Sequence, residues 1–155
     1  MKGNAKINEA LNKLLSLELT AMDQYFIHAQ MYQDWGLNKL YERISHEFDD
    51  EKMHATLLID RMLFLEGIPD MVTREPLRIG KNVKSMLEND LKVEEEVGQL
   101  LKDTIVLCEQ EKDFQTRTIL QKLLEDTEED HAHWLEQQIR LIDMVGAENY
   151  QQSQM

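Results

Sequence analysis

The chain has 155 residues, of which 42% are apolar, and a formal net charge of −13. This length is enough for a buried core, and we treat residues 1–155 as a single domain. The negative charge argues against binding to nucleic acid or to an anionic membrane, whose phosphates would repel it, and favours attraction of cations. The one cysteine, Cys108, excludes an internal disulfide and a four-cysteine metal site within one chain.

Three features predict a cytoplasmic location. Residues 1–13 lack the apolar run of a secretion signal, and no stretch is apolar for long enough to cross a bilayer. The single cysteine also suits a reducing compartment.

The composition and the apolar periodicity both predict an all-α protein. Only two prolines and six glycines interrupt a sequence rich in Leu, Glu, Gln, Lys and Met. Apolar residues recur at three- and four-residue steps in four stretches, which extend over about 5–35, 38–66, 82–112 and 113–146. Gly36 and Gly146 are placed to end the first and the fourth helix, and residues from Ala147 onward favour a short fifth helix.

The segment from Gly67 to Asn82 carries both prolines and has no helical period. Fully extended, it reaches roughly 50 Å, whereas a helix of some 28 residues is only about 42 Å long. The segment can therefore run along the whole bundle, which makes the second and third helices parallel. This predicts the four-helix bundle with one long crossover that ferritin-like proteins have.

One motif occurs twice, once in each half of the chain. A lone glutamate on one predicted helix is followed by Glu-x-x-His on the next helix, 33 positions later in the first half and 34 positions later in the second. The residues are Glu18 with Glu51 and His54, and Glu94 with Glu128 and His131. This is the ligand pattern of a carboxylate-bridged di-iron site in a four-helix bundle.

Each of the four glutamates stands where the helical period requires a core residue. A buried, unpaired carboxylate is costly unless it is neutralised or compensated by a cation. Glu and His three residues apart share a helix face, so each quartet offers an oxygen and a nitrogen to one centre. Two divalent ions would balance four carboxylates, and this mixture of ligands suits iron or manganese.

Symmetry predicts how the ligands divide between two irons. We expect Glu18 and His54 to hold one iron and Glu94 and His131 the other, while Glu51 and Glu128 bridge both. A single Glu-x-x-His is more often an exposed pair than a ligand set, as we expect for the similar quartet that begins at Asp130 and lies off the apolar stripe.

The sequence resembles the bacterioferritins over nearly its whole length. The segments that carry the likeness are residues 11–15 (LNKLL), 23–26 (DQYF), 35–37 (WGL), 64–67 (FLEG) and 148–150 (ENY). The resemblance implies a hollow shell of 24 subunits that oxidises Fe²⁺ with O₂ or H₂O₂ at each intra-subunit di-iron site and stores ferric mineral inside. It also implies a ferredoxin-type electron donor.

Bacterioferritins hold haem between two subunits through one methionine from each, directly after the bridging glutamate of the second helix. Here Lys52 occupies that position, and Met53 is turned from it by about 100° around the helix. The resemblance therefore implies that a shell of this chain alone lacks the usual haem. A mixed shell with a methionine-bearing subunit is the alternative.

Three further residues match functional positions of the family. His46 and Asp50 correspond to residues that bind an extra iron on the inner surface of some bacterioferritins, although a solvated helix face explains the pair equally well. Tyr25 corresponds to the tyrosine beside the di-iron centre, which can supply an electron. A buried tyrosine with a satisfied hydroxyl is the simpler explanation.

Three other functions compete with iron storage. Another di-iron oxidase or peroxidase can use the same bundle, but a rubrerythrin-like enzyme needs four cysteines for its second iron site. A haem-linked subunit for electron transfer and iron release in a mixed bacterioferritin is disfavoured by Lys52. A DNA-coating miniferritin would place its metals between subunits, whereas both quartets here belong to one chain.

Overall fold

The computed structural model describes residues 1–155 and contains only helices and loops, which confirms the all-α prediction. The elements are α1 (Ala5–Asp34), α2 (Asn38–Phe64), α3 (Val83–Gln110), α4 (Phe114–Glu125), the π-helical segment η1 (Asp126–Ala132), α5 (His133–Val145) and α6 (Ala147–Ser153).

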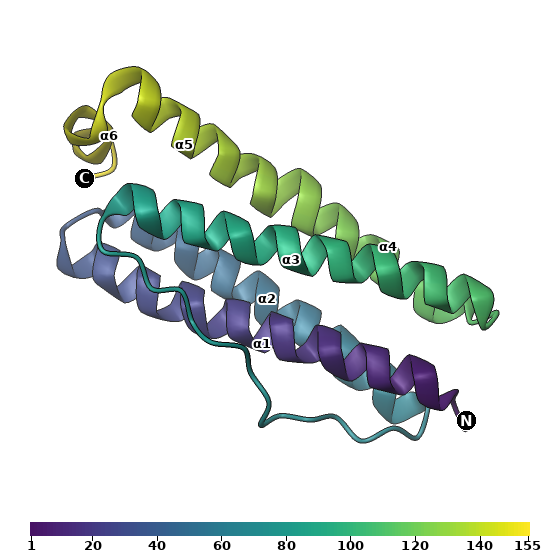
Figure 1. The fold of residues 1–155 in the computed structure, drawn as a ribbon. Coiled ribbons are helices and arrows are strands. Elements are labelled where there is room, and N and C mark those ends of the chain that lie inside the picture. Colours follow the sequence, from purple (N-terminus) through teal and green to yellow (C-terminus); the bar gives the residue numbers. More distant parts are fainter.

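Two antiparallel helical hairpins form the bundle (Figure 1). The first joins α1 to α2 through a short turn at Gly36, whose φ of 76° suits glycine. The second joins α3 to the continuous rod formed by α4, η1 and α5. The chain between the hairpins runs along the bundle, so α2 and α3 point in the same direction (Figure 1). The ferritin-like topology with one long crossover is therefore confirmed.

The last long helix differs from the uniform α-helix predicted over 113–146. Within it, η1 widens the backbone turn because its hydrogen bonds join residues five apart instead of four. Single-turn π segments of this kind occur frequently at functional sites. This segment carries the second Glu-x-x-His quartet, so its geometry determines where those side chains point.

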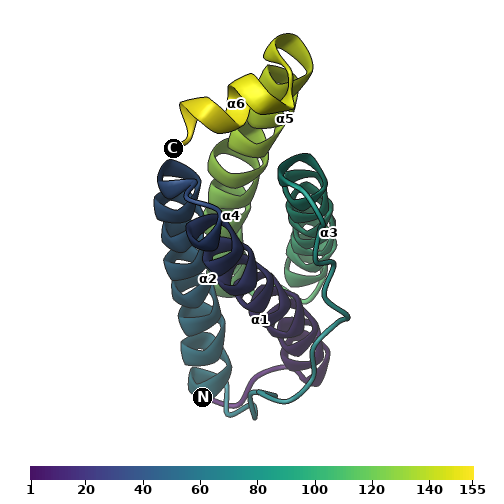
Figure 2. The same ribbon diagram turned by 90° about the vertical axis from the view of Figure 1, so that its left-hand side faces the viewer.

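The predicted short fifth helix is α6, which lies across one end of the bundle (Figure 2). Gly146 turns the chain there with a φ of 86°, in the region that favours glycine. The buried hydroxyl of Tyr150 donates a hydrogen bond to Oε1 of Gln138 at 2.7 Å. This bond ties α6 to α5.

A ladder of polar side chains on α1 holds the crossover loop in place. Asn12 donates to the carbonyl of Ile68 at 3.0 Å and accepts from the amide of Asp70 at 2.8 Å. Further along α1, Thr20 accepts from the backbone amide of Glu75 at 2.9 Å, and the side-chain oxygen of Gln24 accepts from the backbone amide of Arg78 at 3.0 Å. At the end, His28 Nε2 accepts from the amide of Gly80 at 3.2 Å.

A buried acidic residue on α3 anchors the far end of this ladder. Oδ1 of Asp90 lies 2.8 Å from both Gln24 Nε2 and His28 Nδ1, and all three side chains are buried. Burial raises the pKa of Asp90, against the lowering effect of its bonds to His28 and Gln24. The loop is therefore fixed to α1 and α3 together.

Removal of the central amide tests the ladder. Gln24→Met removes one of the two hydrogen bonds to Asp90 and leaves the part-buried amide of Arg78 without a partner, so we expect the free energy of unfolding to fall by about 1–3 kcal/mol. Denaturant titration at fixed protein concentration measures this change. Exposed Gln30→Met on the same helix is the matched control, with an expected change within about 0.5 kcal/mol. Equal stability of the two variants would show that the ladder contributes nothing.

Candidate metal centre

Five of the six side chains predicted as metal ligands meet in the middle of the bundle. Glu18 comes from α1, Glu51 and His54 from α2, Glu94 from α3 and His131 from η1. Each of the five is at most 1% exposed. Their ligand atoms form two groups, Glu18 with Glu51 and His54, and Glu51 with Glu94 and His131, each within 4.8 Å. Glu51 belongs to both groups.

The two histidines present the same ring nitrogen to this cluster. His54 Nδ1 lies 3.5 Å from Glu18 Oε2 and 3.6 Å from Glu51 Oε2. His131 Nδ1 lies 3.0 Å from Glu51 Oε1 and 3.3 Å from Glu94 Oε1. The rings are stacked with their centroids 5.7 Å apart. The Glu51 carboxylate thus lies between two equivalent nitrogen donors.

Most polar atoms that face the interior of the cluster lack hydrogen-bond partners. Both oxygens of Glu18, both oxygens of Glu51, one oxygen of Glu94 and Nδ1 of each histidine are buried without a hydrogen bond of acceptable geometry. Native proteins rarely leave buried polar atoms unpaired, so such a group requires an explanation. Carboxylate oxygens and imidazole nitrogens are ligands for divalent transition metals, and the cluster fits a pair of such ions.

Without metal, the cluster retains protons. Burial, followed by the neighbouring charge of Glu51, raises the pKa of Glu18 to about 8. Burial alone would lower the pKa of His54, but Glu18 and Glu51 raise it to about 11. The pKa of His131 is likewise raised, since the nearby carboxylates outweigh its burial. At neutral pH the site therefore holds protons that bound metal ions would displace.

The outer nitrogen of each histidine faces a further carboxylate. His54 Nε2 donates to Asp126 Oδ2 at 3.1 Å. His131 Nε2 lies 2.7 Å from Glu47 Oε2 and 3.1 Å from Asp50 Oδ2. A carboxylate behind a metal-binding imidazole fixes the ring orientation and makes the opposite nitrogen a better ligand. Both histidines are thus oriented toward the interior.

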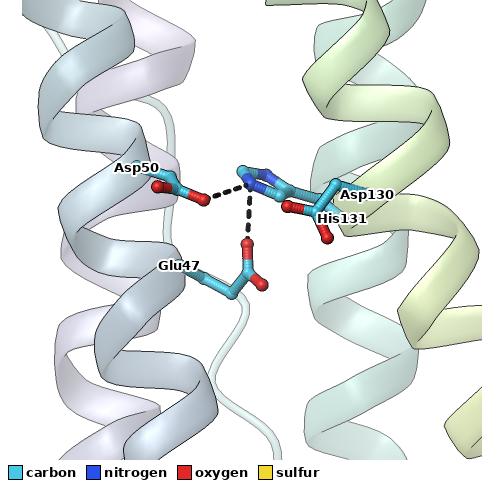
Figure 3. A group of neighbouring side chains, drawn as sticks. All are labelled: Glu47, Asp50, Asp130 and His131. Atoms are coloured by element: carbon cyan, nitrogen blue, oxygen red, sulfur yellow. Dashed lines mark hydrogen bonds and ion pairs between the residues drawn. The ribbon is translucent and has the colours of Figure 1, made fainter.

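Glu47, Asp50, Asp130 and His131 form a third group, in which Glu47 and His131 are buried, Asp50 is half-buried and Asp130 is exposed (Figure 3). Arg43 joins two of them, because its guanidinium donates to Glu47 at 2.6 Å and to Asp130 at 2.9 Å. Burial would raise the pKa of Glu47, but His131 and Arg43 lower it. Glu47 is therefore a charged partner of His131.

The structure places the predicted pair His46 and Asp50 next to this outer group. Their side chains are 3.4 Å apart, with His46 exposed and Asp50 half-buried. Asp50 contacts His131, whereas His46 does not belong to the group of converging ligands. Their role as iron ligands stays a prediction.

Of the six residues in the repeated motif, Glu128 alone does not join the buried cluster. Its side chain is 48% exposed, and its carboxylate lies 3.1 Å from Lys102 Nζ. The expectation that Glu128 and His131 share a helix face assumed α-helical spacing. In η1 the wider turn instead places Thr127 and His131 together on the buried face.

Tyr25 lies beside the cluster as predicted. Its hydroxyl donates a short hydrogen bond to Glu94 Oε1, and its ring is fully buried. Burial and the neighbouring carboxylates raise its pKa well above the usual value.

Lys52 and Met53, at and after the haem-ligand position, are both exposed. Asp130 and His133, the quartet expected to face outward, are exposed too.

Sequence reasoning missed two of the carboxylates that support the histidines. Glu47 lies three residues after Ile44 and four before Glu51, so it continues the same stripe and the periodicity contains a signal for it. Asp126 has no such signal, because it begins the π segment η1, whose wider turn the α-helical period does not describe.

Comparison with known proteins agrees with this geometry. The ferritin-like domain model matches residues 8–145. A bacterial ferritin of Synechocystis sp. is 57% identical over the whole chain and 99% of its own length, and one of Pseudomonas aeruginosa is 53% identical over the full length of both. This chain belongs to the bacterioferritin family. A bacterioferritin of Brucella melitensis is 41% identical over 98% of this chain and 94% of its own length.

This bacterioferritin-family chain has no helix that combines the length and the apolar character needed to cross a lipid bilayer. Its one cysteine, Cys108, is a buried free thiol. Burial raises the pKa of that thiol to about 11, so it is protonated at neutral pH and forms part of the core.

The raised pKa values predict proton release when metal binds. At pH 7, Glu18 with a pKa of about 8 and His54 with a pKa of about 11 both hold protons, as does His131. Zn²⁺ binding should therefore release about three protons per chain at pH 7 and about two at pH 9, where Glu18 is already ionised. Affinity should fall as the pH drops, because protons then compete more strongly.

Titration of weakly buffered, metal-free protein with a pH indicator measures this release. Glu9→Gln, which removes an exposed carboxylate on α1, is the control and should leave the release unchanged. Tight Zn²⁺ binding with no proton release at pH 7 would contradict the protonation described for the cluster.

Proposed function

We propose that this protein stores iron and is a ferroxidase that oxidises Fe²⁺ to Fe³⁺ at a di-iron centre within each subunit. The main support is the buried cluster in which Glu51 is shared between two sets of ligands. The relatives are named bacterial ferritin or bacterioferritin, and their similarity extends over the whole chain.

Each half of the cluster binds one Fe²⁺ in this proposal. Glu18 and His54 hold one ion, Glu94 and His131 hold the other, and Glu51 bridges both. Glu128 is the proposed second bridge, although its side chain points outward in this structure. Asp126 behind His54 and Glu47 behind His131 keep the ligating nitrogens directed inward.

The reaction removes one electron from each of the two Fe²⁺ ions. The two electrons and two protons convert O₂ to H₂O₂, or H₂O₂ to two molecules of water. Anionic carboxylate oxygens stabilise Fe³⁺ more than Fe²⁺, so the glutamates favour this loss of electrons. Burial excludes bulk water and strengthens the interaction between the carboxylates and the ions.

Tyr25 is the proposed source of a further electron. Its hydroxyl donates to Glu94, which is a ligand of the second iron in this account. A tyrosine that loses an electron must also lose its phenolic proton, and the Glu94 oxygen is in place to accept it. Because the pKa of Tyr25 is raised by burial and nearby carboxylates, the hydroxyl stays protonated until oxidation.

Asp50 and His46 are the proposed ligands of an additional iron ion. Asp50 lies between the buried His131 and the exposed His46, at 3.1 Å from the first and 3.4 Å from the second. With Glu47, Asp130 and His131 it forms a group whose ligand atoms lie within 4.8 Å of one another (Figure 3). Because His131 also contacts Glu51 and Glu94, and Asp130 is exposed, this group suits the transfer of a divalent cation between the surface and the buried cluster.

We further propose that the subunit assembles into a 24-subunit shell in the cytoplasm and receives electrons for iron release from a ferredoxin-type donor. Exposed apolar side chains such as Phe26, Met53 and Val72 provide surface for contacts between subunits. A shell of this chain alone would lack bis-methionine haem, because Lys52 replaces the ligand. A mixed shell with a methionine-bearing subunit would restore one ligand.

An anaerobic Fe²⁺ titration followed by an oxygen pulse tests the ferroxidase proposal. We expect rapid oxidation that saturates near two irons per chain. The near-ultraviolet absorbance of the ferric product measures this phase. Glu51→Ala should abolish this phase, because the variant loses the shared ligand. Mutation of a residue that only orients a metal ligand typically lowers metal affinity or activity 10- to 100-fold. Loss of the shared ligand itself should therefore lower the oxidation rate by about 100-fold or more.

Glu42→Ala is the matched control on α2, because Glu42 is an exposed glutamate away from the cluster. It should oxidise iron at the wild-type rate. If wild type shows no phase near two irons per chain, or if Glu51→Ala retains it, the buried cluster is not the ferroxidase centre.

A further inference from the structure

The carboxylate of Glu128 lies at a hollow that leads to the metal cluster. The hollow has a volume of about 200 Å³, and both Glu94 and Glu128 line it. Lys102, on α3, also lines this hollow, and its ammonium nitrogen lies 3.1 Å from Glu128 Oε2. Glu128 is therefore beside an opening whose inner wall includes a proposed iron ligand.

The backbone next to the hollow leaves room for a side chain to move. Gly98 on α3 lies in its wall, and a Cβ atom there would meet only Thr127 of η1, at 3.9 Å. The absence of a side chain at Gly98 keeps the space between α3 and η1 open. Glu128 lies within η1, whose widened turn is a local departure from the α-helix at a functional site.

Charge gives Glu128 a reason to move when metal binds. The three glutamates already in the cluster carry a charge of −3 when ionised, whereas two divalent ions carry +4. Burial of the remaining positive charge is unfavourable. A fourth carboxylate from Glu128 would balance it. In this structure the Glu128 carboxylate is paired with Lys102 instead.

We propose that Lys102 is a positioning residue that holds Glu128 outside the metal-free cluster, and that Glu128 turns through the hollow onto the two metal ions when they bind. This inference rests on the proposed di-iron function. The ion pair with Lys102 is lost when Glu128 turns inward, so Lys102 lowers the affinity of the site for metal. Glu128 therefore turns inward only when both ions are bound.

The size of the effect follows from the exposure of the pair. Both side chains are about half exposed, at 51% for Lys102 and 48% for Glu128. Exposed ion pairs of this kind shift an equilibrium by about two- to fivefold and are screened by salt. Lys102→Met should therefore bind a pair of Zn²⁺ ions about two- to fivefold more tightly than wild type at low salt.

Calorimetric Zn²⁺ titration of metal-free protein measures this difference without any redox reaction. Lys102→Arg retains the cation and should bind Zn²⁺ as wild type does. Lys92→Met removes an exposed lysine elsewhere on α3 and is the matched control, with no expected change. In 1 M salt the advantage of Lys102→Met should disappear. In a Glu128→Gln background Lys102→Met should have no effect, because the ion pair is already absent.

Crystal structures of metal-free and Zn²⁺-loaded wild type test the movement itself. We expect Glu128 beside Lys102 in the first and at about 2.0–2.2 Å from the zinc ions in the second. If both ions are bound while Glu128 still contacts Lys102, or if Lys102→Met binds Zn²⁺ no more tightly than wild type, this inference is wrong and the di-iron proposal stands. If wild type binds no pair of ions, both proposals are wrong.

Discussion

The cost of burying carboxylates in an apolar bundle is the constraint on which the rest of this structure depends. Glu18, Glu51 and Glu94 lie at core positions, and five of their six carboxylate oxygens lack hydrogen-bond partners that would replace water. Without metal, the cluster compensates by holding protons on Glu18 and on the two histidines. Two metal ions would replace those protons. The same cost explains why the supporting carboxylates lie behind the histidines, where they orient the rings.

The fold positions the cluster through two independent sets of contacts. The apolar core fixes the four long helices relative to one another, and the side chains of the five predicted ligands on α1, α2, α3 and η1 meet inside the bundle. The polar ladder on α1 separately holds the crossover loop, and its anchor Asp90 lies one helical turn before Glu94 on α3. The loop that makes α2 and α3 parallel is thus connected to the helix that carries the predicted ligand Glu94.

Much of this arrangement was predictable from residue spacing. The helix ends at Gly36 and Gly146, the crossover from Gly67 to Asn82 and the convergence of five predicted ligands follow from α-helical periodicity and chain length. The position of Glu128 did not follow, because the i, i+3 rule assumes α-helical turns and η1 is a π segment. Asp126 was missed for the same reason. The ladder from Asn12 to His28 does have a four-residue spacing, but polar residues at that spacing usually indicate a solvated face.

Anomalous diffraction at the iron edge, from crystals loaded with Fe²⁺ under anaerobic conditions, tests the central claim most directly. The account predicts two iron peaks about 3.5–4 Å apart, one between Glu18 and His54 and the other between Glu94 and His131, with Glu51 in contact with both. A single peak in the cluster, or iron only at the outer group of Glu47, Asp50 and Asp130, would contradict it.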